Sequence, residues 1–205
     1  MAKVRFNKKT GYIDKDGVLI IPIIYNKANF YNDVIVAWKD SKWGILNKEG
    51  KILAPFIYNK IGSFEKNGLA VASIVNNKGK IKNGFINQKG QLVIPLIYYA
   101  TRSFQNNLAG VEVSPNKWGY IDDKGKIKIE PKYVRVDDFD ENGFARVSTI
   151  DDTHFVNPKG EVVVGYVDKG DFVGNGDLTR TIDEYEQIIN TKGEIIRLLK
   201  KEQTK

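Results

Sequence analysis

Six copies of one short motif, placed at a nearly constant interval, constrain the fold more than any other feature of this chain. Each copy consists of a short apolar run, then Asp or Asn, two further residues and Gly. The copies occupy residues 12–17, 45–50, 85–90, 120–125, 155–160 and 188–193, and they end on Gly17, Gly50, Gly90, Gly125, Gly160 and Gly193. Successive glycines are 33, 40, 35, 35 and 33 residues apart, by subtraction of their numbers. A fixed period of this size indicates a repeat architecture.

The motif itself predicts a β-hairpin. Asp or Asn at its first position can accept hydrogen bonds from the turn amides, and Gly at its fourth can adopt a left-handed conformation. The apolar runs on either side then form two antiparallel strands. In four copies the second run ends on proline, where we expect the ladder to stop and the chain to turn. These prolines are Pro22, Pro55, Pro95 and Pro131.

A third short strand is expected in each unit, as in residues 68–72 and 143–147. The chain is therefore predicted to be all-β, with about six short, antiparallel, three-stranded units. Trp43 and Trp118 stand at equivalent places, each between Lys and Gly. Because they recur with the repeat, we expect them to pack between sheets, with stacking on sugars or bases as the alternative.

These motifs resemble the bacterial WG-repeat family, also called the KWG-repeat family. The resemblance rests on Lys-Trp-Gly at residues 42–44 and 117–119, on the six turns and on the four prolines followed closely by tyrosine; it covers about residues 2–199. The fifth unit departs from the pattern with His154 for Gly and Gly165 for Pro, and the sixth with Gln187 and Leu198. The resemblance implies repeated β-structure and an interaction role, and it implies no enzymatic activity.

The two ends of the chain suggest how the array closes. Residues 2–4 read as a third strand without a unit, and residues 188–199 supply only strands one and two of the sixth unit. We therefore predict one domain over residues 1–199, a propeller-like ring closed by the termini, followed by a polar tail at 200–205. An open β-solenoid is the alternative. Residues 182–201 also have an interpretation as a helix, which Gly193 would interrupt.

Composition narrows the function classes. The chain of 205 residues has no cysteine, so disulfides and thiolate metal sites are excluded, and no apolar run is long enough to predict a membrane span. Met1 leads directly into polar sequence, so no signal peptide is expected; this fits a cytoplasmic protein or, if residues precede Met1, a secreted one.

Charge is divided unevenly along the chain. Residues 1–110 carry 17 basic and 6 acidic side chains, whereas residues 111–205 carry 15 and 19. Such a field can steer an acidic partner to one side. With 26 lysines against 6 arginines, readout of nucleic acid is the least expected function, because base and phosphate recognition favours arginine.

No set of residues points to catalysis. His154 is the single histidine and lies beside Asp151 and Asp152. A tolerated substitution is the favoured interpretation, and cation binding or proton transfer is the alternative. Two neighbouring carboxylate pairs, Asp122 with Asp123 and Asp137 with Asp138, are taken as solvated charges rather than as glycosidase pairs. We expect no enzyme, metal or cofactor.

The best candidate site is a set of loops that connect strand three to the next strand one. They span residues 37–42, 75–83, 114–117, 149–153 and 181–186, and they are expected on one face of the array. Loops of variable length on a repeat scaffold usually form its binding surface. The candidate residues are Trp38, Lys39, Lys42, Lys78, Lys80, Lys82 and Lys117, with Trp38 expected to be the most exposed aromatic.

The function favoured by these observations is a non-enzymatic scaffold that binds another protein or macromolecule through the loops. A carbohydrate or cell-surface binding module is the alternative, with glycoside hydrolysis as its remote variant. Nucleic-acid binding comes third.

Overall fold

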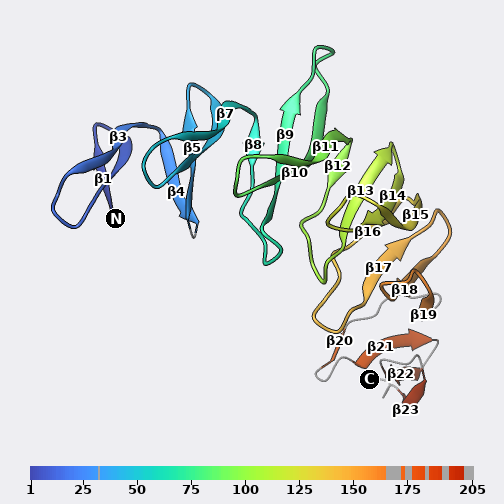
Figure 1. Ribbon diagram of the computed structural model, residues 1–205. Helices are drawn as coiled ribbons and strands as arrows, with labels where there is room; N and C mark the ends of the chain where they lie inside the picture. Colours follow the sequence, from blue (N-terminus) through green and yellow to red (C-terminus); the bar gives the residue numbers. More distant parts are fainter. Residues whose placement is uncertain (32, 165–171, 174–176, 183–184, 191–193, 201–205) are drawn as a thin grey trace. The chain divides into compact units, whose positions relative to one another are not determined.

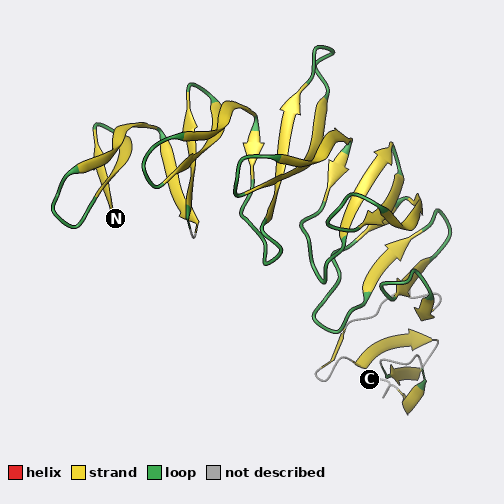
Figure 2. Cartoon of the chain, in the orientation of Figure 1, coloured by secondary structure: helices red, strands yellow, loops and turns green. Residues whose placement is uncertain are grey.

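The computed structural model describes residues 1–31, 33–164, 172–173, 177–182, 185–190 and 194–200. Across these ranges the regular structure is entirely β, and no helix occurs (Figure 2). The all-β, propeller-like repeat class predicted from the sequence is confirmed.

The strands form six antiparallel sheets, in each of which the spatial order follows the chain (Figure 1). The first sheet contains β1 (Ala2–Phe6), β2 (Lys9–Ile13) and β3 (Leu19–Tyr25). The second contains β4 (Lys27–Tyr31), β5 (Val34–Lys39), β6 (Lys42–Asn47) and β7 (Ile52–Tyr58). The third contains β8 (Lys60–Ile61), β9 (Leu69–Val75), β10 (Ile81–Asn87) and β11 (Leu92–Tyr98). The fourth contains β12 (Ala100–Thr101), β13 (Ala109–Ser114), β14 (Lys117–Ile121) and β15 (Ile127–Tyr133). The fifth contains β16 (Arg135–Val136), β17 (Ala145–Ser148), β18 (Thr153–Val156) and β19 (Val162–Val164). The sixth contains β20 (Phe172–Val173), β21 (Asp177–Ile182), β22 (Tyr185–Ile189) and β23 (Ile195–Lys200).

Each sheet combines strands that the sequence analysis assigned to two successive units. The predicted third strand pairs with strand one of the following unit, as β5 pairs with β6. Five of the sheets also contain a short first strand that was not predicted, of which β4 is the longest. The strands were therefore placed correctly along the chain, but the unit boundaries fall between strands two and three.

The two end sheets correct the predicted sharing of one sheet by the termini. Ala2 is paired with Ile13 within the first sheet, so β1 already has a partner in its own hairpin. In the last sheet β21 occupies the position that β1 was expected to fill, and it pairs with β22. The helical alternative for residues 182–201 is also wrong, because β22 and β23 are strands.

The turn motif acts as its residues suggested. The Asn47 Oδ1 atom accepts hydrogen bonds from the amides of Glu49 (3.1 Å) and Lys51 (2.8 Å). Gly17, Gly50, Gly90, Gly125 and Gly160 all have positive φ, whereas Gly193 lies outside the described residues. The same bonding recurs at Asn76 and at Asp140, beyond the six predicted copies. One local turn therefore closes hairpins at several places in the repeat.

The prolines lie inside strands, which corrects the expectation that pairing stops there. In the second sheet Trp43 faces Tyr58 and Ile45 faces Ala54, so four steps along β7 oppose two steps along β6. Pro55 lies within this bulge, after which the ladder resumes. Gly44 faces the bulge, and a Cβ atom on it would lie 2.9 Å from the carbonyl oxygen of Ala54. The glycine of Lys-Trp-Gly is thus required by close backbone approach.

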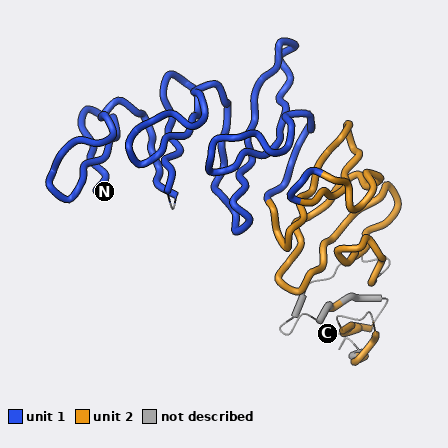
Figure 3. Tube along the Cα trace, in the orientation of Figure 1, with its two compact units in different colours: residues 1–103, 123–125 blue, residues 104–122, 126–205 orange. Residues whose placement is uncertain are grey.

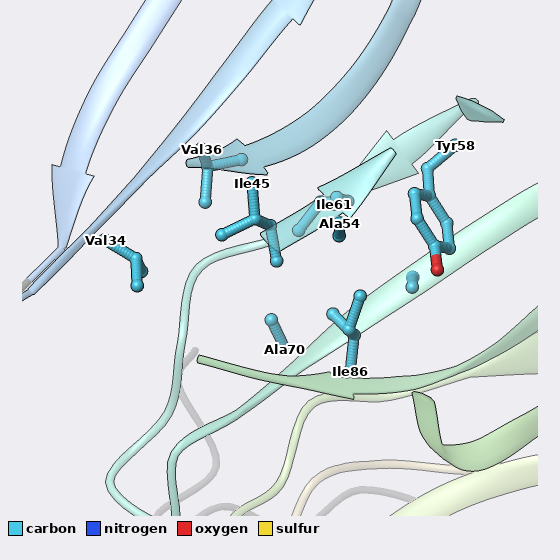
Figure 4. Packing of buried hydrophobic residues seen from close by; sticks show 9 residues of the cluster. Val34, Val36, Ile45, Ala54, Tyr58, Ile61, Ala70 and Ile86 are labelled. Carbon is cyan, nitrogen blue, oxygen red and sulfur yellow. The ribbon is translucent and has the colours of Figure 1, made fainter. Parts of the chain in front are cut away.

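Two compact units make up the chain, residues 1–103 with 123–125 and residues 104–122 with 126–205 (Figure 3). In the first unit, one core joins residues of the second and third sheets, including Val36, Ile45, Tyr58 and Ile86 (Figure 4). Trp43 packs against this core, and Trp118 packs against a core of the second unit. Both tryptophans thus contact a core that joins two sheets, as the structural role expected for them requires.

Candidate binding surface

The hairpins β1–β2, β5–β6 and β9–β10 project from the same end of the three sheets of the first unit. The connection that leaves the last strand of a sheet lies at this end as well. In the second sheet, Tyr58 at the end of β7 faces Trp43, which lies beside the β5–β6 hairpin. Two ring contacts show that neighbouring sheets point the same way. At the end that carries these hairpins, Tyr25 of the first sheet stacks on Phe56 of the second. At the opposite end, Tyr31 of the second sheet contacts Phe64, which follows β8 of the third. We call this end the tip face; it comprises residues 7–9, 26–27, 38–42, 59–60, 75–83 and 97–99. The opposite end, with residues 14–18, 33–34, 47–51, 62–68 and 87–91, is the turn face.

The hairpins of the tip face differ in length for identifiable reasons. Asp40 and Ser41 have φ of 52° and 63°, so a two-residue turn with both φ values positive joins β5 to β6. The β9–β10 hairpin is longer and extends beyond its neighbours (Figure 1). The Asn76 Oδ1 atom organises it by accepting hydrogen bonds from the amides of Lys78 and Lys80, both at 3.0 Å. The tips therefore vary while the ladders beneath them keep one register.

Trp38 does not lie in a loop, which corrects the prediction. It is a residue of β5, is half-buried and faces Trp43, with 6.4 Å between the ring centroids. The Lys27 ammonium lies 5.8 Å from the centre of the Trp38 ring. The two-residue turn at Asp40 and Ser41 extends both strands and so brings Trp38 into the sheet.

Three lysines occupy the same place in successive sheets. Each of them lies two residues before the glycine that faces the bulge. The Lys9 and Lys42 ammonium groups donate to the Oδ1 atoms of Asn26 and Asn59, each at 3.1 Å. The Lys82 ammonium donates to the Ile97 carbonyl oxygen at 3.0 Å and lies 3.8 Å from the centre of the Tyr99 ring. Neutral acceptors therefore fix these cations on the tip face.

Charge is segregated between the two ends of the first unit. The tip face carries nine lysines and one carboxylate, that of Asp40, which lies 3.9 Å from the Lys39 ammonium. The lysines are Lys8, Lys9, Lys27, Lys39, Lys42, Lys60, Lys78, Lys80 and Lys82. The turn face carries five lysines and five carboxylates, and there Lys48 pairs with Asp33. The basic excess of the chain's first half thus lies mainly on one surface.

Four of these lysines were not predicted as site residues: Lys8, Lys9, Lys27 and Lys60. Lys8 and Lys9 were missed because residues 2–4 had been assigned to another sheet, which hid the β1–β2 hairpin. A usable signal was present in Lys-x-Gly, which recurs at Lys9, Lys42, Lys82 and Lys117 and not only where Trp is the middle residue.

The remaining predicted loops belong to the second unit. Within residues 114–117, positions 115 and 116 connect β13 to β14, and the exposed Lys117 begins β14 and pairs with Ser114 across the hairpin. Of residues 149–153, positions 149–152 connect β17 to β18 through a turn in which the Thr149 hydroxyl accepts a hydrogen bond from the Asp152 amide at 3.0 Å, and Thr153 begins β18. Of residues 181–186, positions 183 and 184 lie outside the described ranges.

The other candidates for chemistry have ordinary structural settings. The Asp137 carboxylate forms ion pairs with the guanidinium groups of Arg135, at 3.4 Å, and Arg146, at 3.2 Å, so it belongs to a local ion-pair network. His154 lies in β18 opposite Val147. Among the described residues, no group of three or more His, Cys, Asp or Glu is arranged to hold a metal ion. In the same part of the chain, no helix is long and apolar enough to cross a membrane.

Sequence comparison identifies the repeat. The profile of the WG-containing repeat matches residues 11–43, 43–78, 84–114 and 118–151, which together make up more than half of the chain. No curated protein sequence matches this chain.

Structure comparison gives distant similarities. A crystal structure described as the eukaryotic initiation factor is 10% identical, with a TM-score of 0.51, and the match covers 96% of this chain and 72% of that one. BamB from Moraxella catarrhalis is 14% identical, with a TM-score of 0.42 and coverages of 94% and 70%. The C-terminal WD40 domain of Sif2 is 9% identical, with a TM-score of 0.43 and coverages of 95% and 66%. At 10% identity, the likeness to the first of these structures concerns the fold alone.

Proposed function

We propose a function from the premise that the chain belongs to the WG-repeat family and has a propeller-like repeat fold, a fold typical of protein-interaction scaffolds. We infer that the protein is a non-enzymatic scaffold and that the tip face of its first unit binds another protein.

The observation that carries this proposal is the contrast between constant strands and variable tips. The three sheets of the first unit keep equivalent hairpin registers, whereas two of their tips are two-residue turns, at Asn7 and Lys8 and at Asp40 and Ser41, and the third is the longer turn organised by Asn76. A scaffold of this kind can change its binding surface without disturbing the sheets.

The tip face is also ordered before any partner arrives. Asn26 and Asn59 hold two of its lysines by hydrogen bonds, and Tyr99 lies against a third. Fixed side chains lose less conformational entropy on binding than free ones, so ordered groups support affinity.

A pull-down with paired variants tests the proposal. The tip variant carries Lys78→Ala and Lys80→Ala, two exposed positions on the tip face, and the matched control carries Lys66→Ala and Lys89→Ala, two exposed positions on the turn face. Both variants lose the same charge. We expect the tip variant to lose a protein partner that the wild type and the control retain, by quantitative mass spectrometry. Retention of every partner by a folded tip variant would contradict the proposal.

A further inference from the structure

We propose that the tip face of the first unit binds an extended acidic segment of a partner polypeptide, with Lys9, Lys42 and Lys82 as a row of carboxylate-binding cations. This inference rests on the proposed function and adds the chemical class of the partner and the residues that would recognise it.

Local charge is the first argument. Nine lysines and one carboxylate share the tip face, whereas the turn face of the same unit is balanced at five and five. Lysines that serve only solubility have no reason to gather at one end of the sheets. A surface of one sign attracts a partner of the opposite sign and also sets its orientation.

The second argument is how the row is held. The acceptors of Lys9, Lys42 and Lys82 are two side-chain amide oxygens and one backbone carbonyl, all of them neutral. Each ammonium group has three N–H donors, so a carboxylate can still be bound after one donor is used. The cations are therefore positioned while their charge stays uncompensated by these contacts.

The third argument is spacing. The three lysines hold equivalent positions in three successive sheets, since each lies two residues before the glycine that faces the bulge. Packed sheets lie about 10 Å apart. An extended polypeptide advances about 3.3 Å per residue, so carboxylates at every third residue would match the row.

The same features argue against nucleic acid as the occupant. The tip face contains no arginine, the residue best suited to phosphate and base edges. Binding of single strands also relies on open aromatic rings. Trp38 is half-buried against Trp43, and Lys82 lies against one face of the exposed Tyr99 ring, so the tip face offers at most one open ring of that kind.

A peptide titration tests the inference. The probe is a fluorescent twelve-residue peptide made of four Glu-Gly-Ser repeats, and its neutral counterpart has Gln for Glu. We expect the acidic peptide to bind the full chain at low salt, with affinity that falls as salt rises, and the neutral peptide to bind at least tenfold more weakly. A single-stranded DNA with equal charge serves as the rival ligand.

Two triple variants localise the binding. The tip variant carries Lys8→Glu, Lys60→Glu and Lys80→Glu, three exposed lysines of the tip face, one from the first sheet and two from the third, and the control carries Lys51→Glu, Lys66→Glu and Lys89→Glu on the turn face. Net charge changes equally in both. We expect at least a tenfold loss of peptide affinity in the tip variant and less than a threefold loss in the control. A third variant, Lys42→Gln, should weaken binding while circular dichroism stays unchanged.

Each other outcome overturns the inference in its own way. Equal losses in the two triple variants would mean that overall charge, and not the tip face, governs binding. Tighter binding of the DNA with the same lysine dependence would make nucleic acid the occupant. Salt-sensitive self-association that the tip variant abolishes would make a second copy of the chain the occupant. Absence of peptide binding, together with loss of a protein partner in the Lys78 and Lys80 variant, would overturn only the acidic class and leave the scaffold function standing.

Discussion

The second and sixth sheets build the same hairpin in two ways. In the second, Gly44 faces a bulge around Pro55, and four steps along β7 oppose two along β6. In the sixth, Gln187 replaces the glycine and faces Leu198, which replaces the proline, and the ladder there runs residue against residue. Both sheets also have a smaller shift in strand register beside the Asp/Asn turn. It lies between Ile45 and Leu46 in the second sheet and between Ile188 and Ile189 in the sixth.

The difference indicates that the glycine on one strand and the bulge around the proline on the next strand depend on each other. The bulge pushes backbone carbonyl groups into the space where a side chain on strand one would lie, so only glycine fits opposite it. Where the bulge is missing, as beside Gln187, an ordinary side chain is accommodated. The departures of the sixth unit from the family pattern are therefore coupled, and they follow from one change in strand pairing.

The largest expected effect concerns contact between sheets. Gly90 and Gly17 occupy the same turn position, with φ of 77° and 82°. A Cβ atom on Gly90 would meet the Leu53 carbonyl group and lie 2.9 Å from the Ala54 nitrogen, whereas nothing lies within 4 Å of one on Gly17. We expect Gly17→Ala to cost about 1 kcal/mol from backbone strain alone, and Gly90→Ala about 4 kcal/mol. Urea unfolding checks the pair, and equal losses would contradict the role given to this contact.

The second prediction tests the comparison directly. A Cβ atom on Gly84 would meet the Ile94 carbonyl oxygen and lie 2.7 Å from the Pro95 carbonyl carbon, so Gly84→Ala forces the backbone bulge to move. We expect a loss of about 3 kcal/mol in the free energy of unfolding. The matched change Gln187→Ala, at the equivalent place without a wide bulge, should cost less than about 1 kcal/mol. A similar cost at both positions would mean that the bulge does not explain the glycine.

The sequence predicted the features that depend on neighbours along the chain. The Asp/Asn turns and their flanking strands follow from bonds such as those of Asn47 to the amides of Glu49 and Lys51, which span at most four residues. The repeat period then supplied the number of hairpins. These local signals were sufficient for the all-β class and for most strand positions.

The features that were missed depend on contacts across space. The pairing of Gly44 with the bulge at Pro55 joins two strands, and neither residue alone indicates it. Trp38 was placed in a loop because Asp40 and Ser41 lack the Asn-Gly signal of a two-residue turn. The charged surface was only half recognised, because the tip face gathers Lys8, Lys27 and Lys60 from three connections far apart in the chain.

A third prediction concerns what the two kinds of sheet share. The Asn47 side chain accepts hydrogen bonds from the amides of Glu49 and Lys51 in its turn, and the Asn190 side chain likewise accepts a hydrogen bond from the Glu194 amide at 2.9 Å. We expect Asn47→Ala and Asn190→Ala each to cost about 1 kcal/mol, because the turn is independent of the bulge. Thermal unfolding of the two variants checks this, and a loss confined to Asn47→Ala would restrict the turn's role to bulged sheets.

The smallest expected effect is a loss of folding stability at alkaline pH. It is expected from the sheets with a wide bulge, because their bulged strands end on a buried tyrosine. Tyr25, Tyr58 and Tyr98 end the bulged strands of the first unit, whereas Leu199 faces Glu186 at the corresponding place in the sixth sheet. Burial raises the pKa of each of these tyrosines above its ordinary value, because the charged phenolate is poorly solvated there.

The unfolded chain therefore deprotonates first as pH rises. Stability from the neutral phenols is complete below about pH 10, the ordinary pKa of tyrosine, and is lost as pH rises through the folded values. A variant with Tyr25→Phe, Tyr58→Phe and Tyr98→Phe lacks this loss. Deprotonation of lysine affects both proteins alike, so the difference between their urea unfolding curves from pH 8 to 11 isolates the tyrosines. We expect the wild type to lose stability relative to the variant only above about pH 10. Parallel curves over the whole range would show that the phenols are already solvated in the folded sheets.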